Sequence, residues 1–471
     1  MMTSSNAKTY ACQALLATCL FVGASCSPTP DPTNLLLVVV DSLRADRLDS
    51  YGHDRPTPVI AKLAAEGVIF DEAYACAPWT MPSVAAMFTG LPPTIHGATN
   101  TDALLAKDLE TLAERLASKG YATSAVVSHH LIGKRFQFDQ GFESFDEELG
   151  RGHKLITSAM LTEKATNELT RLANDERKRP FFLFLHYFDP HYDYRDHAEF
   201  DYAEPVAGRL DGSHGIGQLR RMLDSMSDEE LKFLNDRYDE EVRFTTRSIG
   251  RLLRRLKKLG VEENTLVIFT SDHGEEFRDH GWLGHTQSLY RELVRVPLLM
   301  RGPGIPPGLK IEQPVSLENL AATALDLLNI EGEFGTGSSM RNLLQPGGGE
   351  TFQPVFCEVD YLGVSEGQPG LRTCHKKSII GERYQLIRDD MSGELELYEL
   401  GRDVEQLINL AEKRPEELLR LEKLLDERRT LLTKAARPLE RTEFDEAELD
   451  VLRGLGYVDS ESSKVGTPSD D

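Results

Sequence analysis

Short apolar runs alternate with longer amphipathic stretches along the first two thirds of the chain. The runs at 35–40, 181–186 and 266–269 are almost wholly apolar, which is typical of strands buried on both faces of a parallel sheet. The stretches at 56–66 and 109–119 carry apolar residues at helical spacing. Further strands are expected at 68–70, 122–127 and 298–301, and further helices at 167–178, 227–259 and 317–328. This alternation predicts an α/β fold with a mostly parallel central sheet covered by helices on both faces.

The last third of the chain has a different pattern. A Gly-rich stretch at 332–349 precedes four short strand-like runs and a charged helix. The strands are expected at 355–359, 377–381, 384–388 and 395–399, and the helix at 415–434. We therefore expect a main domain over 34–345, a smaller C-terminal antiparallel sheet with a packed helix over 350–440, and a partly disordered tail over 441–471.

The N-terminal 26 residues have the features of an export signal. A thin positive start is followed by an apolar run at 11–23, which is too short to span a membrane. Gly23-Ala24-Ser25-Cys26 resembles a bacterial lipobox, and a Pro-rich tether follows at 27–33. We expect an exported bacterial protein, periplasmic or on the cell surface, with a lipid anchor to a membrane at Cys26. Plain export by cleavage nearby is the alternative.

Composition narrows the class of partner. The 471 residues include 76 Asp and Glu against 53 Lys and Arg, a net charge of −23. A strongly acidic chain is a poor match for nucleic acid, because phosphate backbones require a basic surface. Of the six cysteines, only Cys76, Cys357 and Cys374 lie beyond the signal. Whether Cys357 and Cys374 pair is open at this stage.

Chemically useful side chains follow two of the predicted strands. Asp41 comes directly after the strand at 35–40, and Asp272 with His273 follows the strand that begins at 266. Open α/β sheets place ligand sites at the carboxyl ends of their strands. Thr80 stands at the start of an apolar helical run, where free backbone N–H groups favour a developing anion. The alternative for Thr80 is a simple N-cap.

Several ordered motifs carry a family resemblance from about residue 34 to 458. They are Val40-Asp41-Ser42, the stretch 79–90, Pro92 with His96-Gly97, His186 to His191, Ser271 to Glu275, residues 289–297, residues 396–400 and Asn409-Leu410-Ala411. The chain resembles the sulfatases of the alkaline phosphatase superfamily. The resemblance implies an ester hydrolase, here acting on an anionic ester substrate.

One departure from the sulfatase pattern bears on mechanism. Sulfatases carry Cys-x-Pro-Ser-Arg, whose cysteine becomes formylglycine, nine residues before a Thr-Gly pair. Counting back from Thr89 gives Thr80, and Val84 stands at the arginine position. Cys76 is four residues too early, and we interpret it as a buried small residue. No formylglycine is expected. Threonine at this position is similar to the zinc-dependent branches of the superfamily, in which a threonine attacks phosphorus.

The resemblance implies a set of site residues. Asp41, Thr80, Asp272 and His273 would hold a divalent metal, with Zn²⁺ favoured and Ca²⁺, Mg²⁺ or Mn²⁺ as alternatives. Thr80 would be the nucleophile. His191 and His285 would either bind a second metal or contact the transferred group and protonate the leaving oxygen. Asp189 would join His191 and His285 in binding the second metal or the substrate, or it would orient His191.

Four further histidines and one irregular stretch of the chain lie near these motifs or in the chain around them. His186 lies inside an apolar run and is interpreted as a packed histidine. His129, His130 and His280 are rim groups without discriminating evidence. The stretch 192–225 has little periodicity and is expected to be a surface excursion that sets selectivity.

The leading function is hydrolysis of a sulfuric or phosphoric ester, including phosphodiesters and phosphonates, by metal-activated Thr80. A phosphoryl-group transferase to an envelope acceptor is the closest alternative. A catalytically weak, surface-anchored binding protein that retains the fold is an alternative of another class, because Ser42 and Val84 replace residues that most sulfatases use.

Overall fold

The computed structural model describes residues 33–151, 157–204, 206, 210, 214–345, 348, 352–362, 372–437 and 439–457. These residues belong to one compact unit, Pro32–Asp471. The predicted signal peptide, the lipid anchor at Cys26 and most of the tether lie outside the described residues, as does the end of the predicted tail. Within the described part of the chain, none of the helices combines the length and the apolar character needed to cross a membrane.

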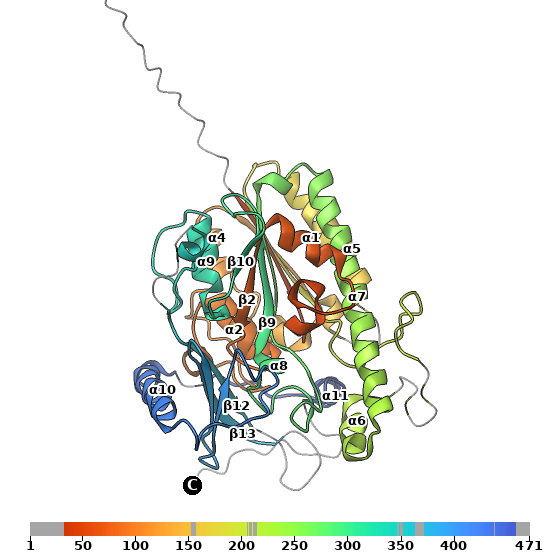
Figure 1. The fold of residues 1–471 in the computed structure, drawn as a ribbon. Coiled ribbons are helices and arrows are strands. Elements are labelled where there is room, and N and C mark those ends of the chain that lie inside the picture. The colour runs from red at the N-terminus through yellow and green to blue at the C-terminus, as the bar shows by residue number, and fades with distance from the viewer. Residues whose placement is uncertain are drawn as a thin grey trace, which may run out of the picture. The chain divides into compact units, whose positions relative to one another are not determined.

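A nine-stranded sheet forms the centre of this unit (Figure 1). Its order is β10-β2-β9-β6-β1-β5-β3-β4, with β11 also paired to β2. Only β9 runs antiparallel to its neighbours, β2 and β6. The strands are β1 (Asn34–Val40), β2 (Val68–Tyr74), β3 (Ala122–Val127), β4 (Ser144–Asp146), β5 (Phe181–Tyr187), β6 (Thr265–Ser271), β9 (Arg295–Arg301), β10 (Leu309–Ile311) and β11 (Val315–Ser316). The predicted, mostly parallel sheet is confirmed.

Helices cover both faces of this sheet because both faces of its central strands are apolar. Leu35, Leu37 and Val39 of β1 pack into one core and Leu36, Val38 and Val40 into the other. Each such buried side chain contributes about 1.5–3 kcal/mol. One face carries α2 (Thr80–Thr89), α4 (Leu112–Ser118) and α9 (Leu320–Leu327); the other carries α1 (Pro58–Glu66), α5 (Ser158–Ala173) and α7 (Asp228–Lys258). A full capping box at Ser227 and Glu230 starts α7, as the sequence predicts.

A second, four-stranded antiparallel sheet carries the C-terminal helix α10 (Pro415–Ala435). Leu421 and Leu425 of α10 pack against Ile379, Leu386 and Leu397 of the sheet. The strands are β12 (Val355–Tyr361), β13 (Cys374–Ile380), β14 (Tyr384–Asp389) and β15 (Leu395–Glu399). This confirms the predicted antiparallel sheet and its packed helix. The exact boundaries proposed for a separate subdomain stay a prediction.

Short elements connect these layers. They are β7 (Glu276–Phe277), β8 (Leu283–Gly284), α3 (Pro93–His96), α6 (Ile216–Met222), α8 (Arg291–Val294) and α11 (Glu446–Gly454). The 3-10 helices are η1 (Ala45–Arg47), η2 (Asp49–Tyr51), η3 (His130–Ile132), η4 (Lys134–Phe136), η5 (Glu148–Arg151), η6 (Leu223–Ser225), η7 (Glu262–Asn264), η8 (Leu317–Asn319) and η9 (Arg341–Leu344).

Two predictions about elements were wrong in part. The helix expected at 167–178 is present as α5, but it runs from Ser158 to Ala173. It begins earlier because the carboxylate of Asp189 accepts hydrogen bonds from the backbone N–H groups of Thr157 and Ser158. The stretch 192–225 is not wholly a surface excursion. Its described part buries Tyr192, Tyr194 and α6 against the core. Cys357 and Cys374 are both buried and both free.

Candidate active site

Three of the predicted site residues meet at the carboxyl edge of β1 and β6. These strands pair in parallel with Val40 opposite Ser271, so Asp41 and Asp272 leave the sheet side by side. The Nε2 atom of His273 lies 3.4 Å from Oδ1 of Asp41. All three side chains are fully buried. The sheet therefore places two carboxylates and an imidazole together, as the sequence predicts.

Thr80 points into the same cluster from α2. Its Oγ1 lies 3.3 Å from Nε2 of His273. Trp79, not Thr80, is the N-cap residue of α2, and no side chain caps this helix end. Ser83 fixes the helix against β6, because its hydroxyl donates to the carbonyl of Asp272 at 2.6 Å. The simple N-cap alternative for Thr80 is therefore wrong, and its hydroxyl faces the polar cluster.

His186 holds Asp272 in place. Its Nε2 lies 3.2 Å from Oδ2 of Asp272, while Oδ1 accepts the backbone N–H groups of Ser42 and His273. His186 is buried within β5, as its apolar surroundings predict. The interpretation as a packed histidine missed its second property, a direct contact with a candidate metal ligand.

Hydrogen-bond partners assign the tautomers of three histidines. Nδ1 of His273 lies 2.8 Å from the Gly274 carbonyl, and Nδ1 of His191 lies 3.1 Å from the Tyr192 carbonyl. In their neutral forms both rings therefore carry the proton on Nδ1, which leaves Nε2 with a lone pair. His129 is the opposite case, because its Nδ1 accepts the backbone N–H of Leu131 at 3.1 Å. A neutral His129 thus bears its proton on Nε2, 3.9 Å from Oδ2 of Asp41.

The charges in this cluster favour a cation. Burial and the nearby Asp272 carboxylate raise the pKa of Asp41 above its ordinary value. Burial opposes the charge of His273, but Asp272 and Asp41 outweigh it and raise the pKa of His273 to about 9. Oδ2 of Asp41 is buried and accepts no hydrogen bond from any described residue. Buried carboxylates are stable when paired with a cation or a metal.

The donor set fits a divalent metal. One ligand atom from each of Asp41, Asp272 and His273 can be chosen so that all lie within 4.8 Å of one another. Carboxylate oxygen with imidazole nitrogen suits Zn²⁺ and also Mn²⁺. Asp41, His129 and His191 form a second group by the same distances. The protonated Nε2 assigned to His129 makes it a hydrogen-bond donor and weakens that group as a second metal site.

His285 lies beside the cluster, and its Nδ1 atom contacts a glutamate side chain. Its Nδ1 lies 2.9 Å from Oε1 of Glu275, and its ring centroid lies 4.4 Å from that of His273 and 4.9 Å from that of His191. Burial and the neighbouring His273 hold the pKa of His285 well below its ordinary value. Burial raises the pKa of Glu275 to about 8. The ring of His285 is thus oriented by a buried acid within reach of the site.

Asp189 is directed away from this cluster. Its carboxylate accepts the N–H of Ser158 at 2.7 Å and the single N–H of Thr157, whose nitrogen lies 3.1 Å from Oδ2 and 3.2 Å from Oδ1. These bonds cap the start of α5 and satisfy the carboxylate there. Its suggested roles in substrate or metal binding remain predictions without support from these contacts.

Comparison with known proteins places this geometry in a family. The Sulfatase family model matches residues 33–330, a span that holds every residue of the cluster described above. The chain belongs to the sulfatase family. Its sequence is 26% identical to Arylsulfatase K of Bos taurus over 82% of this chain and 80% of that protein.

Solved structures share the sulfatase fold. A putative sulfatase from Bacteroides thetaiotaomicron superposes with a TM-score of 0.70 at 20% identity, over 88% of this chain and 96% of that one. A phosphonate monoester hydrolase of Agrobacterium radiobacter superposes with a TM-score of 0.67 at 22% identity, over 84% of this chain and 96% of that one. Family membership supports hydrolysis of an ester bond by this sulfatase.

Cys76 of this sulfatase is packed rather than presented to the site. It is 1% exposed, and its Sγ lies 3.6 Å from the Ser316 hydroxyl. Burial raises the pKa of its thiol to about 12, which keeps the thiol protonated and unreactive. These contacts agree with the interpretation of Cys76 as a small buried residue.

Sequence reasoning missed several residues around this site or gave them too little weight. His129 was named only as a rim group, although it follows β3 at the same sheet edge as Asp41. Glu275 had a usable signal, because it lies in the segment just after Asp272-His273. The sequence carries no signal for Tyr192 and Tyr457, because only the tertiary structure brings their hydroxyls to His285. His280 lies elsewhere, paired with Glu292 and stacked on Tyr290.

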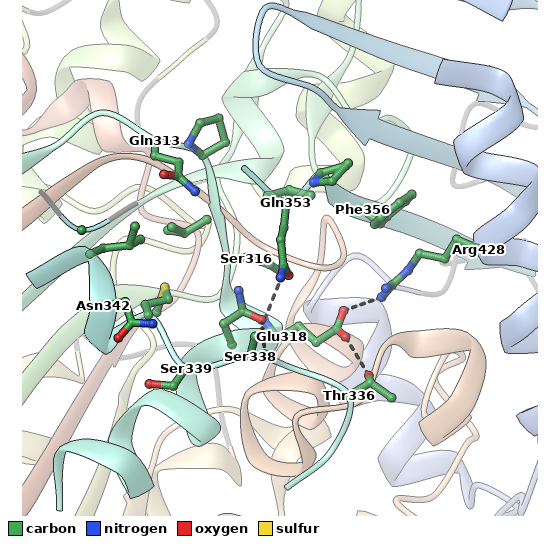
Figure 2. A pocket seen from close by; sticks show the side chains of 18 of the residues that line it. Gln313, Ser316, Glu318, Thr336, Ser338, Ser339, Asn342, Gln353, Phe356 and Arg428 are labelled. Atoms are coloured by element: carbon green, nitrogen blue, oxygen red, sulfur yellow. Dashed lines mark hydrogen bonds and ion pairs between the residues drawn. The ribbon is translucent and has the colours of Figure 1, made fainter. Parts of the chain in front are cut away.

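A separate cavity of about 710 Å³ lies where β11, η9 and β12 approach one another (Figure 2). Its wall is mostly uncharged and polar, with Gln313, Ser338 and Asn342 among the lining residues. Its charged pair is Glu318 with Arg428, which lie 2.6 Å apart. Because none of the cluster residues lines it, this cavity is not the catalytic pocket.

Proposed function

We propose that this protein is a metal-dependent hydrolase of sulfuric or phosphoric esters, including phosphodiesters and phosphonates, with Thr80 as nucleophile. The observation that carries the proposal is the position of the Thr80 hydroxyl, 3.3 Å from Nε2 of His273 at the uncapped start of α2. The family is metal-dependent, and this chain supplies the donors for a metal at that point.

Asp41, Thr80, Asp272 and His273 would hold the metal, with Zn²⁺ favoured and Ca²⁺, Mg²⁺ or Mn²⁺ as alternatives. Such an ion supplies Lewis-acid chemistry and lowers the pKa of a hydroxyl. His186 and the Ser42 N–H fix the carboxylate of Asp272, and the Gly274 carbonyl fixes the ring of His273. Partners of this kind orient ligands and sharpen affinity.

The chain also offers donors for the transferred group. No side chain caps the start of α2, so the backbone N–H groups of Thr80 and Met81 are available where negative charge would develop. His129 presents Nε2–H toward the same space, beside Asp41. His191 and His285 lie next to each other, and we assign the protonation of the leaving oxygen to this pair, one ring of which first takes up the proton that it then passes on. Complete burial of these groups strengthens each interaction.

Threonine changes the second half of the reaction. A formylglycine hydrate has a second hydroxyl through which it can expel the bound group. Thr80 has one hydroxyl, so the covalent ester must be cleaved by attack of water at phosphorus or sulfur, with Oγ1 of Thr80 leaving and taking a proton. This chemistry favours phosphoric esters over sulfates, and it admits an acceptor alcohol in place of water, which is the transferase alternative.

A trapped intermediate tests the proposal. The zinc-loaded protein is mixed with an aryl phosphodiester, quenched in acid and digested, and the peptides are sequenced by mass spectrometry. We expect a phosphorylated Thr80, and no such peptide from Thr80→Ala. Modification at another residue would overturn the assignment of the nucleophile. If the phenol is released in the presence of glycerol and the phosphoryl group is found on glycerol and not on water, the protein is a transferase. If the protein binds stoichiometric metal but turns over no ester, the binding-protein alternative is favoured.

Export and lipid anchoring at Cys26 belong to the same proposal. The motif at 23–26 supports them. Labelling of expressing bacteria with a clickable palmitate analogue, compared with Cys26→Ala, tests the anchor. Equal labelling of both proteins would contradict it.

A further inference from the structure

The C-terminal segment of the chain returns to the active site. We call residues 439–457 the C-terminal strap. It follows α10 and joins the main domain through a bridge between Ala103 and Arg441. The Leu104 N–H donates to the Glu440 carbonyl at 2.9 Å, and the Thr442 N–H donates to the Asp102 carbonyl at 2.8 Å. The strap is thus attached by backbone hydrogen bonds before its helix begins.

The helix of the strap, α11, is anchored at its start. Asp445 and Glu448 form a complete capping box, and Glu448 pairs with Arg135 at 2.7 Å. Leu452 and Leu455 are fully buried in the same core as α2. The capping box and the buried leucines indicate a folded element with a fixed position, and not a solvated tail.

A tight turn after α11 delivers Tyr457. Gly456 adopts φ +69°, and a Cβ there would lie 2.5 Å from the side chain of Ile216. Its carbonyl accepts from Arg220 at 3.1 Å, and the next carbonyl, that of Tyr457, accepts the hydroxyl of Tyr361 at 2.7 Å. Only glycine fits this turn, and the two carbonyl bonds hold the Tyr457 backbone on both sides of it.

The side chain of Tyr457 lies over the catalytic cluster. It is 1% exposed, and its hydroxyl lies 3.2 Å from Nε2 of His285. Its ring centroid lies 5.7 Å from Trp79, the residue before Thr80, and 6.1 Å from His129. Tyr192 is the other hydroxyl partner of His285, at 3.4 Å. Glu275 on Nδ1 and Tyr457 on Nε2 therefore hold the imidazole from opposite ends.

We propose that the C-terminal strap completes the active site and that Tyr457 is a positioning residue, whose hydroxyl orients His285 for the transferred group. This rests on the proposed function for the identity of the reaction. The strap lies beyond residues 33–330, the span that the family model matches. A phenylalanine would fill the same space, so packing alone does not explain the hydroxyl, which gives Nε2 of His285 a nearer hydrogen-bond partner than the Tyr192 hydroxyl does.

Three variants test this proposal. They are Tyr457→Phe, a chain ending at Gly454, and the control Tyr121→Phe. Tyr121 is also buried, and its hydroxyl donates to the Thr33 carbonyl at the opposite end of the sheet. A chain ending at Ser460 controls for truncation itself. For each we measure kcat and KM with an aryl phosphodiester, the melting temperature and the bound metal.

We expect Tyr457→Phe to lower kcat about tenfold, the effect of about one hydrogen bond, with KM and metal content unchanged. Its melting temperature should match that of Tyr121→Phe, whose kcat stays at the wild-type value. The chain ending at Gly454 should keep its metal and lose turnover, and the chain ending at Ser460 should keep both. Wild-type kcat in Tyr457→Phe would overturn the proposal, as would a loss of kcat shared by Tyr121→Phe.

A spectroscopic readout separates this proposal from the proposed function. In protein with ¹⁵N-labelled histidine, the Nε2 resonance of His285 is identified by its absence in His285→Gln. We expect it to move in Tyr457→Phe and to stay in place in Tyr121→Phe. The shift of the resonance is expected even if the wild-type protein turns over no tested ester. Such a lack of turnover would count against the proposed function alone. An unmoved resonance would overturn the role of Tyr457.

Discussion

Thr80 Oγ1 lies 3.3 Å from Nε2 of His273, although 193 positions separate the two residues in the chain. The contact joins the start of α2 to the carboxyl end of β6, and Asp41 from β1 lies 3.4 Å from the same nitrogen. A hydroxyl, an imidazole and a carboxylate are thereby held together, and all three side chains are fully buried.

Asp272→Asn should lose bound metal and turnover together. The substitution removes the charge that His186, Ser42 and His273 hold in place, and loss of a ligand charge weakens a site by well over tenfold. Metal content is measured by mass spectrometry after dialysis against metal-free buffer. Asp236→Asn is the control, since Asp236 is also buried but pairs with Arg55. Full metal occupancy in Asp272→Asn would remove the proposed site.

Glu275→Gln should lower kcat by about tenfold while metal stays bound, because the Glu275 side chain orients His285, which is not one of the four residues proposed to hold the metal. Steady-state kinetics at fixed metal concentration provide the measurement. Glu241→Gln serves as control, since Glu241 is also a buried acid, whose pKa burial raises, and it accepts the N–H of Arg195. If both variants lose activity equally, the effect of Glu275 is structural.

Cys76→Ala should keep wild-type turnover. The thiol is buried against Ser316, and burial raises its pKa to about 12, so it neither attacks substrate nor reaches a modifying enzyme in the folded chain. Activity is compared per mole of folded protein, with the melting temperature as the check on folding. Abolished turnover with an unchanged melting temperature would reinstate Cys76 as the source of the nucleophile.

His280 should give the protein a stability that depends on pH. Burial opposes its charge, but the Glu292 carboxylate at 2.6 Å outweighs burial and raises the pKa of His280 to about 9. The contribution is therefore complete below about pH 6.5, the ordinary histidine pKa, and is lost as the pH rises through about 9. We expect His280→Gln to lower the free energy of unfolding by roughly 1–3 kcal/mol at pH 6.

Urea denaturation at pH 6, 8 and 10 checks this dependence. The difference between wild type and His280→Gln should shrink toward pH 10, leaving the part due to lost stacking on Tyr290 and the bond to the Gln406 carbonyl. A difference that stays constant across this range would show that the ion pair with Glu292 contributes nothing.

The sequence predicted the parts of this site that follow from strand direction. Asp41 and Asp272 each end a buried strand, and two adjacent parallel strands must bring their ends together. The same rule would have placed His129, which follows β3, beside Asp41 and not at the rim of the site. It could not find Tyr457, whose position depends on how the strap crosses the main domain, nor the start of α5, which is capped by the remote Asp189. Patterns report local preference, whereas these contacts depend on tertiary structure.

Turnover of matched substrates tests the central claim most directly. An aryl phosphodiester, phosphomonoester and sulfate are assayed with zinc-loaded wild type, Thr80→Ala and the control Thr89→Ala, whose hydroxyl donates to the Ala85 carbonyl at the other end of α2. We expect wild type and Thr89→Ala to hydrolyse a phosphoric ester, and Thr80→Ala to lose at least about 1000-fold in kcat. Turnover that survives in Thr80→Ala would contradict the account, because the hydroxyl beside His273 would then not be the nucleophile.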